Sequence, residues 1–131
     1  LKGPREPGLG PLIIVSLDIA PGSLNSYLQL HKGRIEAEDK SVTWISEDSG
    51  ESIDGCPNTA RLEYECNFEA ANKEQVRVRA LQYIMEDKPR FYRVTCFVPA
   101  SLYEKYLPRF EASARSFRRV PIGRANVGSI K

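Results

Sequence analysis

Apolar and polar residues follow two periods along this chain, and the change between them separates predicted strands from predicted helices. From Leu62 to Phe68 they alternate singly, which is typical of a strand with one buried and one solvated face. Residues 75–85 and 90–98 each predict a further strand, and residues 86–89 between them predict a hairpin loop. Together these segments predict an antiparallel meander.

Two further segments are rich in β-branched residues. Residues 12–19, LIIVSLDI, predict a strand that is buried on both faces, because aliphatic side chains occupy successive positions. Residues 41–47 predict another strand. Residues 48–58 predict a turn-rich connection, since they include Gly50, Gly55 and Pro57.

Two segments have the apolar spacing of an amphipathic helix. The first begins after an N-cap at Ser23. The second covers residues 102–117 and begins with an S-x-x-E capping box formed by Ser101 and Glu104. Pro108 inside it predicts a kink or a delayed start of the regular helix. The order of elements favours an α+β fold in which two amphipathic helices flank one antiparallel sheet.

Composition narrows the class of protein. The chain has 131 residues, enough to bury a core without a metal or a disulfide framework. Its formal net charge of +2 argues against nucleic acid or an anionic membrane as the main partner. No apolar run approaches the roughly 20 residues of a transmembrane helix. We expect one domain over residues 1–119 and a basic C-terminal tail over residues 120–131.

Residues that usually perform chemistry are few. The chain has three cysteines and no C-x-x-C pair, and a disulfide between Cys66 and Cys96 would require the strands to place them side by side. The one histidine, His31, falls on the apolar face of the first helix and is interpreted as a core or rim residue. No phosphate-binding glycine loop and no nucleophile elbow occur. We therefore expect neither an enzyme nor a bound cofactor.

Two groups of charged residues are candidates for binding. Arginines on neighbouring predicted strands would form one exposed basic face, with two aromatic residues of interface type between them. The alternative is a ladder of ion pairs with Glu63 and Glu65. An acidic cluster is a weak candidate for Ca²⁺ or Mn²⁺, with a solvated loop as the simpler interpretation. The basic surface comprises Arg77, Arg79, Tyr83, Arg90, Phe91 and Arg93, and the acidic cluster comprises Glu47, Asp48, Glu51 and Asp54.

Three stretches carry a family resemblance. They are DGCPNTARLEY at 54–64, VRALQY at 78–83, and FYRVTCFVP at 91–99 followed by YLPRFE at 106–111 and SFR at 116–118. With these motifs the chain resembles the PsbP-like superfamily, which includes DcrB-type and Mog-type proteins, over about residues 3–119. Family members usually begin with a β-hairpin that is absent here. This difference implies either a truncated chain or another subunit that covers the exposed edge strand.

The resemblance implies a PsbP-like α/β/α sandwich and a non-catalytic accessory role. The superfamily includes extrinsic photosystem II subunits of the thylakoid lumen, bacterial envelope proteins and chaperones for secreted effectors. It therefore implies the lumen or the cell envelope, with a soluble intracellular protein as the other option. We expect a protein-binding accessory or assembly subunit of a larger complex. The alternatives are a chaperone, or a module that binds a small ligand or Ca²⁺/Mn²⁺ beside helix 102–117 or at the acidic cluster.

Overall fold

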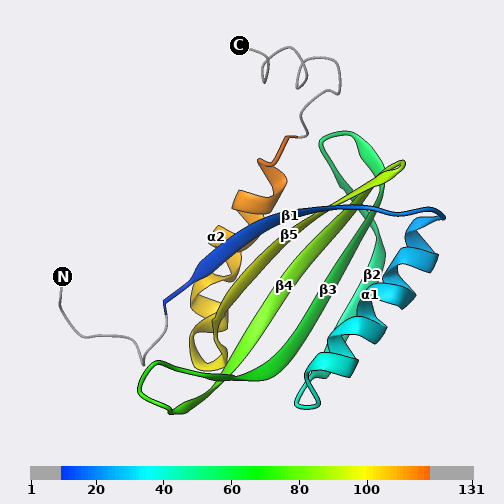
Figure 1. The fold of residues 1–131 in the computed structure, drawn as a ribbon. Coiled ribbons are helices and arrows are strands. Elements are labelled where there is room, and N and C mark those ends of the chain that lie inside the picture. Colours follow the sequence, from blue (N-terminus) through cyan, green and yellow to red (C-terminus); the bar gives the residue numbers. More distant parts are fainter. Residues whose placement is uncertain (1–9, 119–131) are drawn as a thin grey trace, which may run out of the picture.

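The computed structural model describes residues 10–118 and contains one five-stranded antiparallel sheet with two helices (Figure 1). The predicted α+β class and the predicted order of elements are confirmed. The predicted tail over residues 120–131 lies outside the described residues. The elements are β1 (Leu12–Ile19), α1 (Leu24–Glu38), β2 (Thr43–Ile53), β3 (Cys56–Glu69), β4 (Gln75–Asp87), β5 (Arg90–Pro99), a 3₁₀ turn (Ala100–Leu102) and α2 (Tyr103–Arg115).

The strands lie in the order β1-β5-β4-β3-β2, so β4 is central and buried on both faces. Leu81, Tyr83 and Met85 point to one face, where they pack with Phe110 of α2. Ile84 points to the other face and packs against α1. Because successive strand residues alternate between faces, one helix covers each side of the sheet. We call these the α2 side and the α1 side.

Helix α1 follows from its sequence. Ser23 is the N-cap and forms a reciprocal capping box with Ser26. Its buried residues are Tyr27, Leu28 and His31, together with Leu24, at the predicted i, i+3, i+4, i+7 spacing. The predicted start and apolar face of this helix are therefore confirmed.

Helix α2 begins later than predicted. The capping box of Ser101 and Glu104 is wrong, because residues 100–102 form a 3₁₀ turn after Pro99. The N-cap of α2 is Leu102, which makes no side-chain hydrogen bond. Pro108 lies inside this helix, as expected.

The turn-rich connection predicted over residues 48–58 is also wrong. Strand β2 continues to Ile53, and β3 begins at Cys56. Asp54 and Gly55 form the whole turn, with φ angles of 56° and 70°. Two successive residues with positive φ are typical of the tight hairpin turn that an Asp-Gly pair favours, because this turn matches the twist of the two strands.

The disulfide alternative is excluded by the position of the two cysteines. Cys66 lies on β3, opposite Val78, whereas Cys96 lies on β5, opposite Leu81. Strand β4 separates them, and their side chains point to opposite faces of the sheet. Both thiols are free. Burial raises the pKa of Cys96 to about 12.

We expect the α2-side core to contribute strongly to the stability of the domain. Phe110→Ala should lower the free energy of unfolding by about 3–4 kcal/mol, because Phe110 is 2% exposed and its removal leaves a cavity. Leu30 on α1 is 50% exposed and is the matched control, so Leu30→Ala should cost less than about 0.5 kcal/mol. Urea unfolding measures both values. Equal costs for the two variants would contradict the packing described here.

Candidate functional site

Strand β1 carries the largest concentration of exposed apolar side chains in the described structure. The sequence predicted that this strand is buried on both faces, which is wrong. Isolated exposed aliphatic residues are normal, but a continuous run of them marks a candidate interaction surface. We call this surface the aliphatic edge. It consists of Leu12, Ile13, Ile14, Val15, Leu17 and Ile19, whose exposures range from 42% to 75%.

The exposure follows from the position of β1 at the border of the sheet (Figure 1). β1 pairs with β5 alone among the described strands, and both helices lie over other strands. Val15 lies opposite Val94 on the α2 side, and Ile14 lies opposite Thr95 on the α1 side. Neither helix-covered core cluster includes a residue of β1.

A groove with a volume of about 200 Å³ lies on the α1 side, between α1 and the aliphatic edge. Its walls combine aliphatic and aromatic residues with several polar groups. This combination is typical of binding sites, in which apolar walls provide contact area and a few polar groups fix orientation. The lining residues are Ile14, Ser16, His31, Ile35, Tyr64, Gln82, Arg93, Thr95 and Phe97.

A chain of buried hydrogen bonds crosses the floor of the groove. The side-chain amide of Gln82 donates to Thr95 Oγ1 over 2.7 Å. The Gln82 carbonyl oxygen lies 2.8 Å from His31 Nε2, so that ring nitrogen carries the proton and donates. Burial lowers the pKa of His31, and the bond to Gln82 offsets this effect only in part. His31 is therefore neutral at pH 7, and its 3% exposure confirms the interpretation from sequence as a core or rim residue.

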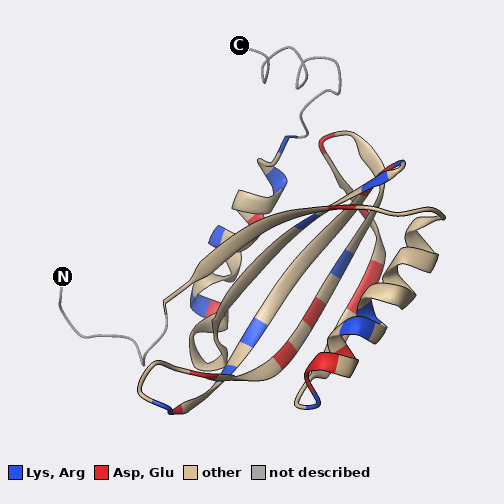
Figure 2. Ribbon diagram, in the orientation of Figure 1, with Lys and Arg blue, Asp and Glu red and all other residues tan. Residues whose placement is uncertain are grey.

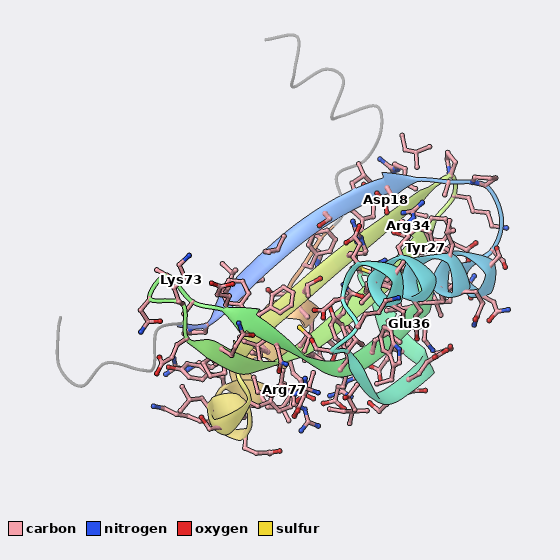
Figure 3. The ribbon with its side chains drawn as sticks, turned by 60° about the horizontal axis from the view of Figure 1, so that its bottom comes forward. Asp18, Tyr27, Arg34, Glu36, Lys73 and Arg77 are labelled. Carbon is pink, nitrogen blue, oxygen red and sulfur yellow. The ribbon has the colours of Figure 1, made fainter. Side chains whose placement is uncertain are left out.

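Asp18 of β1 ties the aliphatic edge to α1 (Figure 3). The Tyr27 hydroxyl donates a short hydrogen bond to the Asp18 carboxylate. Arg93 and Arg34 place guanidinium nitrogens 3.5 Å and 4.0 Å from the same carboxylate oxygen. The Tyr27 bond, together with these arginines, lowers the pKa of Asp18. Burial and the Asp18 bond raise the pKa of Tyr27 to about 12.

The basic surface predicted from the sequence does not form one exposed face. Arg77 and Arg79 lie on the α2 side, whereas Arg93 lies opposite Ile84 on the α1 side. Tyr83 and Phe91 are fully buried, in the α2-side and α1-side clusters respectively. The prediction is wrong because residues on adjacent strands share a face only when the register places them there.

Acidic and basic positions lie close together on the central strands of the sheet (Figure 2), and ion pairs engage these arginines. Glu65 accepts a hydrogen bond from Arg77 over 3.2 Å and forms an ion pair with Arg79 at 3.6 Å. Arg90 pairs with Asp87 at 2.6 Å. The ion-pair ladder that the sequence left as the alternative is therefore present for Glu65.

The charges beneath α2 hold that helix to the sheet. Arg61 lies 3.3 Å from Glu63 and 3.1 Å from Glu111 of α2. Tyr103 donates a short hydrogen bond to Glu63. Burial alone would raise the pKa of Glu63, but the bonds from Tyr103 and Ser46 and the charge of Arg61 bring it below its ordinary value. This cluster is satisfied internally, which makes it a structural feature.

The acidic cluster predicted as a cation site is dispersed. Because β2 extends through these residues, Glu47 reaches α1 and pairs with Lys32, whereas Glu51 reaches α2 and pairs with Arg115. Over residues 10–118, no group of three or more acidic, His or Cys side chains is arranged to hold a metal ion. The remaining members, Asp48 and Asp54, contact the backbone of Gly50 and the guanidinium of Arg118.

The polar pair under the groove was not predicted from the sequence. Gln82 and Thr95 are polar residues in otherwise buried strands, and the 86–89 hairpin places them directly opposite each other. Two facing polar positions in a dry core are a signal that a hairpin register can reveal. Asp18, at the end of an aliphatic run, is a similar signal.

Comparisons with known proteins give a fold and no function. No family model and no curated protein matches the chain. A solved structure from Pseudomonas aeruginosa, described as protein PA94 of unknown function and a candidate regulator, matches with a TM-score of 0.72. It covers 91% of this chain and 79% of that chain at 14% identity, so the likeness concerns the fold alone. Neither α1 nor α2 is long and apolar enough to span a bilayer.

We expect Asp18→Asn to lower the free energy of unfolding by about 1 kcal/mol at pH 7, because the carboxylate binds Tyr27 and two arginines. The folded-state pKa of Asp18 lies below its unfolded value, so its contribution is complete above the unfolded value. The contribution is lost as the pH falls through the folded pKa. Wild type and variant should therefore converge in acid.

Chemical unfolding between pH 7 and pH 2 measures this convergence. The matched control is Asp48→Asn on β2, where an amide oxygen can replace the carboxylate as the acceptor for the Gly50 backbone. Its cost should stay below about 0.5 kcal/mol at every pH. If the loss of unfolding free energy in Asp18→Asn does not change with pH, the charge of the carboxylate does not account for that loss.

Proposed function

We propose that this protein is a non-enzymatic accessory or assembly subunit that binds another protein through the aliphatic edge. The observation that carries the proposal is the run of exposed aliphatic residues on β1. The PsbP-like motifs in the second half of the chain support the same class of non-enzymatic accessory protein. A PsbP-like α/β/α sandwich is part of the proposal. Chaperoning an apolar segment of a partner is one form of this role.

The energetics of the aliphatic edge support a partner. Complete burial of an aliphatic side chain contributes about 1.5–3 kcal/mol, and the six on β1 are about half exposed. A partner that covers them would gain on the order of 5 kcal/mol. This gain is comparable with the loss of translational and rotational freedom on association. The partner must therefore add further contacts to bind stably.

The groove supports a non-catalytic role. A nucleophile needs a base within hydrogen-bond reach, and the hydrogen bond of His31 goes to the amide of Gln82. The Asp18 carboxylate accepts from Tyr27 and faces two arginines. These contacts fix the side chains in place, and the hydrogen bond that His31 makes to Gln82 goes to an amide and not to a nucleophile.

Partner capture tests the accessory function. The tagged full chain should retain at least one protein in near-stoichiometric amount from the cells that express it naturally. Val15→Lys should reduce that amount at least tenfold, because it places a charge in the middle of the aliphatic edge. Ile45→Lys is the matched control, since Ile45 is a 40% exposed aliphatic residue on the opposite border strand, β2. Equal retention by all three proteins, or no retained protein, would contradict the proposal.

A second candidate function is the binding of a small amphipathic carboxylate in the groove. The Nε of Arg93 is buried without a hydrogen-bond partner among the described residues, and the Thr95 hydroxyl already accepts from Gln82 and has a proton to donate. Sodium octanoate should then raise the melting temperature of the wild type and have a smaller effect on Thr95→Val. Octanoate at about 100 times its dissociation constant should add about 2.7 kcal/mol to the free energy of unfolding. The absence of any shift would remove this candidate.

A further inference from the structure

We propose that β1 is a strand-addition site, at which a partner protein inserts an extended, uncharged, aliphatic segment along the outer border of the sheet. The inference rests on the proposed accessory function and specifies the chemistry and conformation of the partner segment. In this binding mode the backbone of the partner provides hydrogen bonds and its side chains cover the aliphatic edge.

The backbone of β1 is suited to accept another strand. Its pairing with β5 runs from Leu12–Phe97 to Ile19–Arg90 without a register shift. In an antiparallel pair, alternate residues direct their N–H and C=O groups away from the neighbouring strand. Over residues 10–118, no strand lies on that outer side of β1. The outward groups therefore form a regular template for a strand.

The opposite border of the sheet shows how this protein protects an edge. The pairing of β2 with β3 is interrupted by three register shifts, and β2 carries Glu47, Asp48 and Glu51. Bulges and charges are the devices that prevent edge-to-edge pairing in soluble proteins. β1 contains no bulge, no proline and no basic residue. Its single acid, Asp18, is engaged by α1 and Arg93.

The side chains of β1 define the chemistry of the added segment. Ile13, Val15 and Leu17 point to the α2 side, and Leu12 and Ile14 point to the α1 side. An added strand would place its own side chains beside aliphatic residues on both faces, where aliphatic cross-strand pairs are favourable. A basic side chain would lose water there and would have to compete with Tyr27, Arg93 and Arg34 for the Asp18 carboxylate. An acidic side chain would lose water beside a carboxylate that repels it. The segment is therefore aliphatic and uncharged on both faces.

A second copy of β1 is a poorer occupant than a segment of different sequence. A two-fold axis at Val15 would place Asp18 of each copy opposite Leu12 of the other. A two-fold axis at Ser16 would place Asp18 opposite Ile14. Either arrangement sets a carboxylate against an aliphatic side chain. These two axes give the longest overlap between two copies of β1, because they pair residues 12–18 or 13–19 of each copy.

Three labelled peptides test strand addition to the full chain by fluorescence anisotropy. The first is KKTVIVTVKK, whose core is β-branched and uncharged and whose lysines keep it soluble. The second has proline in place of its central isoleucine, which removes a ladder hydrogen bond. The third has a helix-forming Leu/Ala core between the same lysines. We expect saturable binding of the first peptide and at least tenfold weaker binding of the other two.

Two variants and one spectroscopic measurement locate the interaction. Val15→Lys should weaken binding of the first peptide at least tenfold, whereas Ile45→Lys should leave it unchanged. Circular dichroism and urea unfolding check that both variants are folded. In hydrogen exchange followed by NMR, the peptide should slow exchange at alternate residues of β1. Protection of both faces of the sheet without this alternation would indicate general coating and overturn the proposal.

Other outcomes would overturn the inference in distinguishable ways. Equal binding of the proline or the helical peptide would show that apolar contact alone suffices. A dimer in light scattering that Val15→Lys abolishes would identify a second copy as the occupant. If cells yield a protein partner but the first peptide does not bind, strand addition fails and the accessory function stands. If the peptide binds as described but no protein is retained, strand addition holds and the accessory function fails.

Discussion

The fold depends on the burial of β4 from both sides. Its side chains alternate between two apolar sets, and each set requires a helix above it. One helix is roughly 10 Å wide, whereas five strands spaced about 4.8 Å apart form a sheet roughly 20 Å wide. A single helix on each face can therefore cover the centre of the sheet but not both borders. The exposure of β1 follows from this mismatch of widths.

The polar groups of the α1 side lie where that helix stops covering the sheet. His31, Gln82 and Thr95 form a hydrogen-bonded chain under its margin, and Asp18 anchors the neighbouring strand to Tyr27. Buried polar groups persist when they are paired, and these pairs fix the orientation of α1 on the sheet. His31, Gln82 and Thr95 also form the floor of the groove, so packing and any binding at this position share these residues.

Local patterns predicted most elements, whereas properties that depend on strand order were not predicted. The spacing of Leu24, Tyr27, Leu28 and His31 states directly which face of α1 is buried. The alternation in residues 62–68 does so only in part, because Phe68 is 48% exposed and the polar Glu63 lies beneath α2. The run at 12–19 does not state whether its strand is central or at a border, because that depends on β1 pairing with β5 alone among the described strands. The predicted basic face of arginines was wrong for a related reason. The register places Arg93 opposite Ile84, on the face that Arg79 does not share.

The two borders of the sheet differ, and this difference limits the size of any assembly built by strand pairing. A β-sheet that is open at both borders can propagate into a fibre, since each added molecule offers a new border. Here the irregular, acidic β2 blocks strand pairing at one border of the sheet. Over the described residues, the molecule therefore offers one border for strand pairing, the one formed by β1. Joined through β1, it would terminate a growing sheet and would not extend it further.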